Sequence, residues 1–267
     1  MKSMIFCDLE NFRHSIKEKY EKYQKIDVNF EKFHHFLLRK ITENLKYEVH
    51  NPRIIRSYVY TGEYTDAQIN KAIIHHRDLP QNQARLKSII SQRQEELKTC
   101  SLPDRKISLE SEISRLKRKV LSPERIENLK IEIGRAKRCQ IAQKALFNDL
   151  SRIHFLELRT KPLKYSPKDL RFIQKGTDVQ LGVDLVNFAH FNNYDIAILC
   201  SGDLDLLESC RLIKELGKTL VIVSHEKQVS PKMVQMSDYY LNIKDLTEPE
   251  LSEISIVENY GNNAEDY

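Results

Sequence analysis

Two carboxylates follow a segment that the sequence predicts to be a buried strand. The apolar run 194–200 ends at a serine–glycine turn, and Asp203 and Asp205 come next, before an apolar-periodic segment at 206–217. The run is typical of a strand covered on both faces, and the periodic segment of a helix. Ligands of open α/β sheets bind at the carboxyl ends of strands. Acids also stabilise helix N-termini, so this pair alone is equally consistent with helix capping.

Three further acids stand at comparable positions. Asp8 ends the first predicted strand, Asp178 opens a helix, and Asp184 lies further along that helix. Asp184 is about 240° round the helix from Asp178, so the two acids do not share one face. The carboxyl ends of parallel strands meet at one sheet edge, which predicts a cleft lined by Asp8, Asp178 and Asp203. Asp184 and Asp205 are additional candidates, and each acid also has a structural interpretation as a cap or a solvent-facing charge.

A cluster of carboxylates predicts a metal ion. Unpaired acids crowded together repel one another unless a cation lies between them. Oxygen ligands favour Mg²⁺ or Mn²⁺, which accept a few carboxylates and keep bound water. The histidine pairs at 34–35 and 75–76 lack the spacing of zinc ligands and are expected at the surface or at boundaries. We therefore predict a Mg²⁺ or Mn²⁺ site built from aspartates.

The predicted elements alternate between strands and helices. The spacing of apolar residues at 30–45 predicts an amphipathic helix, and Thr177 with Gln180 has the spacing of a capping box at the start of another. This alternation is typical of an α/β fold with a mostly parallel sheet and right-handed crossovers. Short apolar and β-branched segments predict strands at 3–7, 52–60, 153–158, 194–200, 218–224 and 239–243.

One long segment differs in composition from the rest. Between Arg85 and Lys144 there are 16 Lys or Arg residues, 8 Asp or Glu residues and no aromatic residue, so this segment carries +8 and the remainder −3. Its apolar residues form a narrow helical stripe that restarts at Ser122-Pro123, a pair typical of a helix N-terminus. We predict a helical hairpin or short antiparallel coiled coil at 83–150, inserted into the α/β fold.

Three interpretations of this hairpin remain open. It could be a solvated insertion, which is the usual meaning of a charged helix. Its stripe could pair within the chain, or between copies in a homodimer or higher oligomer. Its basic face could clamp RNA through phosphate contacts, without the aromatic residues that stack on bases. We favour pairing through the stripe, with the basic face available to RNA.

Composition limits the environment of the protein. The 267 residues are 40% hydrophobic and 30% charged, with a net charge of +5, which suits one large or two small domains and an anionic partner. No apolar run is long enough to span a membrane, and the start of the chain meets acid too soon for a secretory signal. Five cysteines form no CxxC pair, which is typical of buried thiols in a reducing compartment. We expect a cytoplasmic protein without membrane segments.

The acidic segments carry a resemblance to a known family. They read DLEN at 8–11, KGTDVQLGVDL at 175–185 and SGDLDL at 201–206. In the same order they resemble the D-x-x-N, K-G-x-D-V-x-L-x-x-D-L and S-G-D-x-D-F segments of NYN domains, a branch of the PIN-like nucleases. The resemblance covers about 1–61 and 153–243 and leaves out the hairpin.

The resemblance implies a PIN-like, Rossmann-like domain that acts as a metal-dependent endoribonuclease. By motif position, Asp8, Asp178 and Asp203 would bind Mg²⁺ or Mn²⁺ and act in catalysis, and Asp184 would be a further metal ligand. Asp205 and Asn11 would also belong to the catalytic set. Asp205, like Asp184, would be a nearby ligand or lie just outside the ligands, and Asn11 would orient Asp8 or a metal-bound water. Basic residues near the cleft would hold the RNA backbone, with Lys175, Arg13 and Arg171 as candidates.

The expected organisation is discontinuous. Residues 1–82 and 151–246 would form the nuclease domain, 83–150 the inserted hairpin, and 247–267 an acidic, flexible tail. Two other functions are weighed against cleavage of RNA. One is a non-catalytic nucleic-acid-binding or regulatory module of the same fold. The other is a phosphatase using Asp203 and Asp205, but such sites need the first acid directly at the strand end, and a serine–glycine pair intervenes here.

Overall fold

The computed structural model describes residues 1–19, 24–45 and 52–259. The chain divides into two units, which we call the sheet unit and the arm unit and describe separately. The sheet unit comprises Met1–Gly62, Lys144–Lys161 and Lys175–Tyr267, and the arm unit comprises Glu63–Gln143 and Pro162–Gln174.

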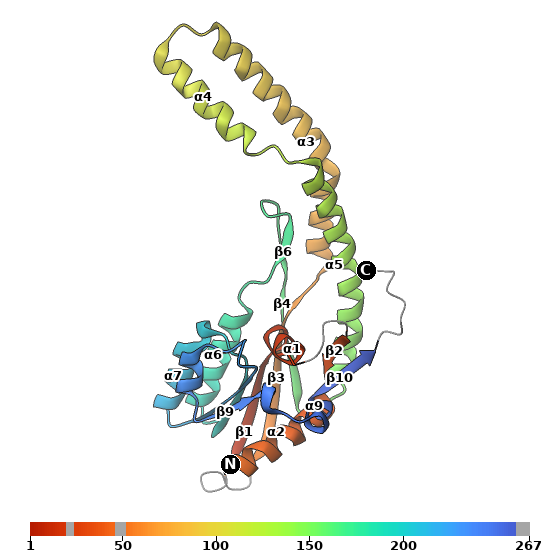
Figure 1. Cartoon of the computed structure of the whole chain (residues 1–267), viewed down its shortest axis with the longest axis vertical. Coiled ribbons are helices and arrows are strands. Elements are labelled where there is room, and N and C mark those ends of the chain that lie inside the picture. The colour runs from red at the N-terminus through yellow and green to blue at the C-terminus, as the bar shows by residue number, and fades with distance from the viewer. Residues whose placement is uncertain (20–23, 46–51, 260–267) are drawn as a thin grey trace. The chain divides into compact units, whose positions relative to one another are not determined.

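A six-stranded sheet with all strands parallel forms the centre of the sheet unit, which confirms the predicted α/β class (Figure 1). The predicted third strand begins later than expected, because Phe155 has a left-handed backbone with φ 62°, which strand geometry excludes. The strands, in their order across the sheet, are β4 (Leu156–Pro162), β3 (Arg53–Glu63), β1 (Lys2–Asp8), β7 (Ile196–Cys200), β8 (Thr219–Ser224) and β9 (Tyr239–Asn242).

Helices cover both faces of this sheet, each through an apolar stripe. In the first helix, for example, Leu9, Phe12 and Ile16 are spaced by three and four residues and are all fully buried. One face is covered by α1 (Leu9–Lys17), α2 (Phe30–Asn44) and α9 (Glu248–Ile254). The other face is covered by α6 (Thr177–His190), α7 (Leu207–Glu215) and α8 (Pro231–Met236).

The strand order contains a switch point beside β1. The chain runs from β1 outward to β3 on one side, and later fills the other side with β7, β8 and β9 in succession. The connection after β1 therefore leads to one side of the sheet, and the connections after β7 lead to the other side. Open sheets bind ligands outside the carboxyl ends of the strands at such a point. Asp8 ends β1, and Asp203 lies three residues beyond the last residue of β7.

The tail, expected as a weak helix followed by a disordered segment, is folded as far as Asn259. Residues 248–254 form α9, which opens with a capping box between Thr247 and Glu250, and residues 255–259 form β10 (Ser255–Asn259). This strand pairs antiparallel with β2 (Gln24–Val28). Acidic composition suggested an unfolded tail, but Leu251 and Ile254 supply enough apolar surface to dock the helix, and both side chains are fully buried.

Leu251→Ala tests whether this segment is part of the folded core. We expect it to lower the free energy of unfolding by about 2–4 kcal/mol, since it removes a buried leucine and leaves a cavity. Urea denaturation followed by circular dichroism measures the change. Leu216→Ala is the matched control, because Leu216 is 43% exposed and its loss should change stability by less than about 1 kcal/mol. Equal effects of the two substitutions would contradict docking of α9.

The arm unit is built from three helices and a small hairpin, and it begins earlier than the predicted residue 83. Its helices are α3 (Asp66–Thr99), α4 (Pro103–Lys117) and α5 (Pro123–Leu150, with its last turns in the sheet unit), and its hairpin pairs β5 (Lys164–Ser166) with β6 (Arg171–Ile173). As predicted, α5 starts at Pro123, and the Ser122 hydroxyl accepts a hydrogen bond from the Arg125 N–H.

The apolar stripe of the arm is buried within the chain itself. Leu109 and Ile113 of α4 are buried where this helix runs beside α3. Leu129 and Ile133 of α5 form a small core with Leu79 of α3 and with the β5–β6 hairpin. Of the two pairings that the stripe allowed, the structure contains the intramolecular one, and burial of these residues requires no second copy.

The predictions about membrane segments and cysteines can also be compared with the structure. None of the helices in the described ranges combines the length and apolar composition needed to cross a membrane. All five cysteines are free thiols, and Cys7 and Cys200 are buried partners in the register of β1 and β7. Neither strand cysteine is available as a surface ligand.

Candidate active site

Asp8 lies at the junction of β1 and α1 and is buried. Its side chain is only 6% exposed, and one carboxylate oxygen accepts the Asn11 N–H at 3.2 Å. Asp8 therefore caps α1, which is the purely structural role considered for it from the sequence. This cap engages one of its two oxygens, so capping and a functional role are compatible at this residue.

The turn after β7 is fixed by a chain of hydrogen bonds. The Asp203 N–H donates to the Ser201 hydroxyl oxygen at 3.3 Å, and the Asp203 carboxylate accepts the Asp205 N–H at 3.0 Å at the start of a short helix (η1, Leu204–Leu206). The side-chain oxygen of Asn11 accepts the Gly202 N–H at 3.1 Å. Asn11 thus connects the end of β1 to the turn that carries Asp203. A positioning role was expected from the resemblance, but toward Asp8 or a metal-bound water and not toward this turn.

Asp178 stands in the first turn of α6, but the predicted capping box is wrong. The N-cap is Gly176, whose φ of 83° lies in the left-handed region that glycine adopts without strain, so Thr177 is one position too late to cap. The Thr177 hydroxyl is 1% exposed and has no hydrogen-bond partner among the described residues.

The charges of four predicted acids act on one another, which shows that these acids lie close together. Burial, together with the neighbouring charges of Asp178, Glu10 and Asp203, raises the pKa of Asp8 to about 7, although the hydrogen bond from the Asn11 N–H acts to lower it. Burial also raises the pKa of Asp178, as do the charges of Asp203 and Asp205. Four of the five predicted aspartates therefore act on one another at the switch point of the sheet.

Asp184 is held differently from the other four. Its carboxylate accepts a hydrogen bond of 3.0 Å from the Tyr60 hydroxyl, and it is half-buried on α6. Tyr60 is fully buried and is the register partner of Asp8 on β3, so its ring lies on the same face of the sheet as the Asp8 side chain. Sequence reasoning missed Tyr60, although its place at the end of a predicted strand was the available signal.

The aspartates offer the oxygen donors that a hard cation prefers, but they are not yet close enough together to surround one. Within the described ranges, no three His, Cys, Asp or Glu side chains are arranged as they stand to hold a metal ion. The coupled carboxylates are all-oxygen donors, and their mutual repulsion falls when a cation lies between them. The histidine pairs are engaged elsewhere, since His34 bonds to the Ser57 hydroxyl and His75 to the Tyr165 hydroxyl, each at 2.7 Å.

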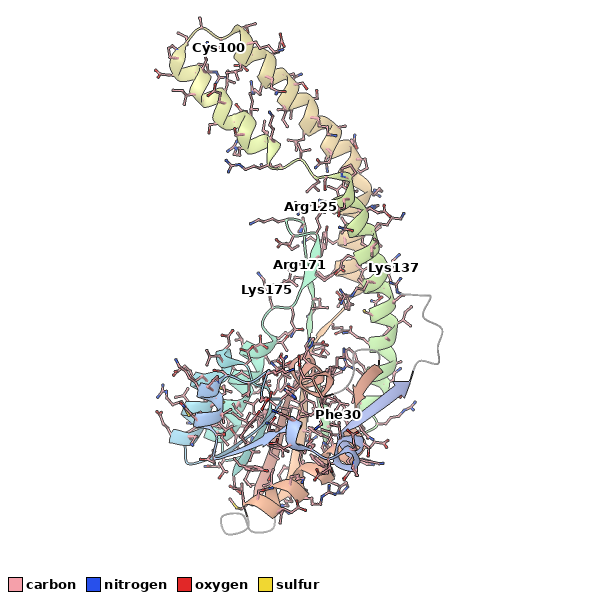
Figure 2. The ribbon with its side chains drawn as sticks, viewed as in Figure 1. Phe30, Cys100, Arg125, Lys137, Arg171 and Lys175 are labelled. Atoms are coloured by element: carbon pink, nitrogen blue, oxygen red, sulfur yellow. The ribbon has the colours of Figure 1, made fainter. Side chains whose placement is uncertain are left out.

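The three predicted RNA-binding residues have different surroundings. Lys175 is exposed and directly precedes the glycine that caps α6, in the sheet unit (Figure 2). Arg13 of α1 is half-buried and forms an ion pair with Glu10 at 3.6 Å. Arg171 is exposed on β6 and belongs to the arm unit. Lys175 is the basic residue closest in sequence to the coupled acids.

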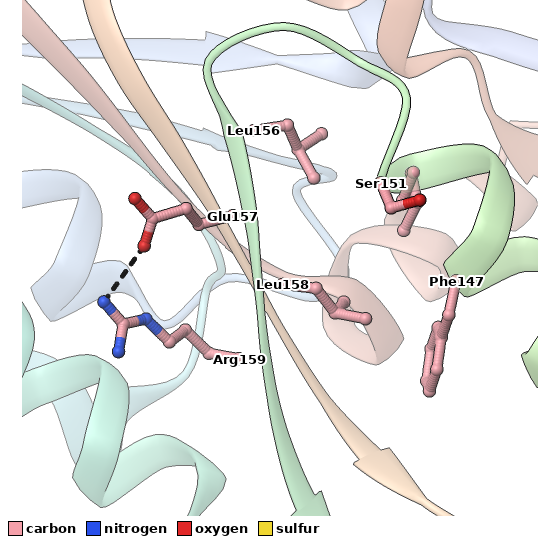
Figure 3. Close-up of a pocket in the computed structure, with 7 residues that line it drawn as sticks. Phe147, Ser151, Leu156, Glu157, Leu158 and Arg159 are labelled. Atoms are coloured by element: carbon pink, nitrogen blue, oxygen red, sulfur yellow. Dashed lines mark hydrogen bonds and ion pairs between the residues drawn. The ribbon is translucent and has the colours of Figure 1, made fainter.

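A separate pocket lies beside the edge strand of the sheet. It has a volume of about 390 Å³ between β4 and the end of α5, and the side chains of Glu157 and Arg159 that line it are bonded at 3.2 Å (Figure 3). Its other lining residues are largely apolar, including Phe147 and Leu156. None of its lining residues is one of the coupled acids, so this pocket is distinct from the candidate active site.

Comparison with known proteins identifies the family. The NYN domain family matches residues 96–244, which include Asp178, Asp184, Asp203 and Asp205. Among solved structures, the chain is similar to a protein of unknown function from Vibrio parahaemolyticus, with 13% identity, 96% of each chain covered and a TM-score of 0.47. No curated protein sequence matches. The family match spans more than half of the chain, which therefore belongs to the NYN domain family of PIN-like nucleases.

Proposed function

We propose that this protein is a metal-dependent endoribonuclease that hydrolyses RNA phosphodiester bonds at the carboxyl ends of β1 and β7. The observation that carries the proposal is the coupling of Asp8, Asp178 and Asp203 at the switch point of the sheet. Membership of the NYN family supports a nuclease reaction. In this proposal the sheet unit is the catalytic domain, and the arm unit is inserted into it.

The residues of the site have separate tasks. Asp8, Asp178 and Asp203 would hold Mg²⁺ or Mn²⁺, and Asp205 would add negative charge beside Asp178. When bound, such an ion lowers the pKa of its water and offsets charge on the phosphate. Asn11 keeps the turn of Asp203 against the end of β1, through its bond to the Gly202 N–H. Lys175 would hold the RNA backbone through its exposed ammonium group.

Asp184 has a positioning role in this proposal. Its bond to the Tyr60 hydroxyl fixes α6 against β3, and the same helix carries Asp178 in its first turn. The Tyr60 hydroxyl donates to one oxygen of the Asp184 carboxylate, so this acid is already engaged by the protein itself. This arrangement supports Asp184 as an outer partner of the site in preference to a direct ligand.

Asp203→Asn is the decisive test of the proposed reaction. End-labelled RNA is incubated with purified protein in Mn²⁺ or in EDTA, and the products are resolved on a sequencing gel. We expect cleavage only with Mn²⁺ and a loss of at least about 100-fold in the variant, because removing a metal-bound carboxylate weakens both metal binding and charge stabilisation. Mn²⁺ binding, followed by isothermal titration calorimetry, should weaken in parallel.

The control for this test is Asp149→Asn, which removes one carboxylate from an exposed position at the end of α5. We expect it to cleave as the wild type does. Cleavage by Asp203→Asn at the wild-type rate would reveal a contaminating nuclease and refute the proposal. RNA binding with no cleavage in any metal would favour the non-catalytic module, and hydrolysis of a phosphomonoester reporter alone would favour the phosphatase.

A further inference from the structure

The arm unit carries a concentrated group of bases where α4 ends and α5 begins. We call it the basic junction, together with the neighbouring β5–β6 hairpin. Its six basic residues are all exposed, and within the described part of the chain none of them forms an ion pair. They are Lys117, Arg118, Lys119, Arg125, Lys168 and Arg171.

Several bases near the α3–α4 turn of the arm are ion-paired, unlike those of the basic junction. Near the α3–α4 turn, Arg93 and Arg105 both bond to Glu96 at 2.6 Å, and Lys98 bonds to Glu95 at 2.9 Å. The bases there are neutralised by their neighbours, although both regions have a similar helical, charged composition. Other exposed bases of the arm, such as Arg115 and Lys137, also have no ion pair among the described residues, so the basic junction stands out because its six bases lie on adjoining segments.

Specific contacts hold the junction in place. The side chain of Gln83 on α3 accepts the Leu121 N–H at 2.9 Å, and its amide group donates to the Lys119 carbonyl. Leu121 and Ile126 pack in the same apolar cluster as Leu170 of the hairpin. The end of α4, the start of α5 and the hairpin thus form one supported surface within the arm unit.

The charges of this surface are not explained by helix stability. Bases at the end of α4 are favoured by the helix dipole, but Arg125 stands in the first turn of α5, where positive charge is disfavoured. Asp169 is the acid among the bases of the hairpin. The pKa of Asp169 is lowered first by a hydrogen bond from the Ser166 hydroxyl and then by the charges of Arg171, Lys168 and Arg125. These three bases are therefore close enough to act on one carboxylate. Figure 2 shows Arg125 and Arg171 on the neighbouring segments.

We propose that the basic junction binds the phosphate backbone of base-paired RNA. The choice of RNA rests on the proposed nuclease function. Base pairing follows from the side chains available, since single-strand binding relies on aromatic residues that stack on bases. Residues 65–143 contain no Phe, Tyr or Trp. Of the aromatic residues of the hairpin, Tyr165 is 3% exposed, and Phe172 is half-buried with its ring against those of Tyr64 and Tyr165. Exposed bases on a fixed surface suit the regular phosphates of a duplex.

Binding of RNA in EDTA tests this proposal independently of cleavage. Fluorescence anisotropy compares a duplex RNA of about 20 base pairs, a single strand of the same length and duplex DNA over a range of KCl concentrations. The test variant combines Arg118→Gln, Lys119→Gln and Arg125→Gln. We expect its affinity for duplex RNA to fall at least about tenfold, and the slope of log affinity against log salt to decrease by about two to three.

The matched control removes three ion-paired bases from the same unit. Arg77→Gln, Lys98→Gln and Lys130→Gln change the net charge by the same amount, and these bases are paired with Asp78, Glu95 and Glu127. We expect duplex affinity within about twofold of the wild type, and circular dichroism should show equal helicity in both variants.

Several results would overturn the proposal. These are wild-type affinity in the test variant, an equal loss in the control, or binding of single-stranded RNA or duplex DNA as tight as that of duplex RNA. Because no cleavage occurs in EDTA, an inactive protein that passes this test would refute only the nuclease function. An active nuclease whose duplex affinity does not depend on the junction would refute only this inference.

Discussion

Asp8→Asn is expected to abolish RNA cleavage and, in the absence of metal, to stabilise the protein at pH 8. The carboxylate is 6% exposed, and burial together with Asp178 and Asp203 raises its pKa from 3.8 to about 7. Between these values the folded state binds more protons than the unfolded state. Stability contributed by Asp8 is therefore fully present below pH 4 and is lost as the pH rises through 7.

The size of this effect follows from the pKa shift. The rise of the Asp8 pKa from 3.8 to about 7 corresponds to roughly 4 kcal/mol of lost stability at pH 8. Asparagine is uncharged, nearly the same shape and a good N-cap, so it should retain the hydrogen bond from the Asn11 N–H while removing the repulsion. The variant is thus expected to gain stability through the same change that removes a metal ligand.

Thermal unfolding in EDTA at pH 5 and pH 8 measures the predicted change in stability. The wild type should lose stability between the two values, whereas Asp8→Asn should lose much less and melt higher at pH 8. Mn²⁺ should raise the melting temperature of the wild type and have little effect on the variant. Asp149→Asn again serves as the control. If Asp8→Asn melted below the wild type at pH 8, the carboxylate would have to be stabilised by a partner, and the proposed cation site would lose its support.

Gly202→Ala is expected to have the second large effect, on folding and activity together. A Cβ at this position would lie 2.2 Å from the Gln228 carbonyl oxygen and 2.6 Å from the Val229 Cα. Both atoms belong to backbone, which cannot rotate away, and the Gly202 carbonyl also accepts the Ser230 N–H. We expect a loss of about 1–3 kcal/mol or more, and displacement of the turn that carries Asp203.

Gly134→Ala provides the matched control for this substitution. Its Cβ would be 3.7 Å from the flexible end of Arg138, in the interior of α5, so alanine should be neutral or stabilising by about 0.5–1 kcal/mol. Urea denaturation and the cleavage assay compare the two variants. A stable Gly202→Ala protein with full activity would mean that the loop at 225–230 can move away from the site.

Much of the fold and the acid cluster followed from local sequence patterns. Short apolar runs alternating with amphipathic segments predicted the strands and helices, because burial on both faces or on one stripe leaves its period in the sequence. The acids could then be placed together without further information, since parallel strands deliver their carboxyl ends to one edge. Asp8 and Asp203 were predicted as neighbours for this reason, although 194 residues separate them along the chain.

Contacts between distant segments decided the rest. The sequence at Thr177 and Gln180 fits a capping box, but a left-handed Gly176 sets the start of α6 one residue earlier. The bond from Tyr60 to Asp184 and that from Gly202 to Asn11 join elements whose relative position no local pattern records.

The sequence by itself therefore determined the α/β class, the ends of the central strands and the set of acids beside them. Only the tertiary structure decided that Asp184 is held by Tyr60, that residues 248–259 fold, and that the apolar stripe of the arm pairs within the chain. The physical reason is the sequence distance between the residues that interact. Periodicity and capping depend on neighbours in sequence, whereas docking depends on whether a distant surface of matching shape buries the same few side chains.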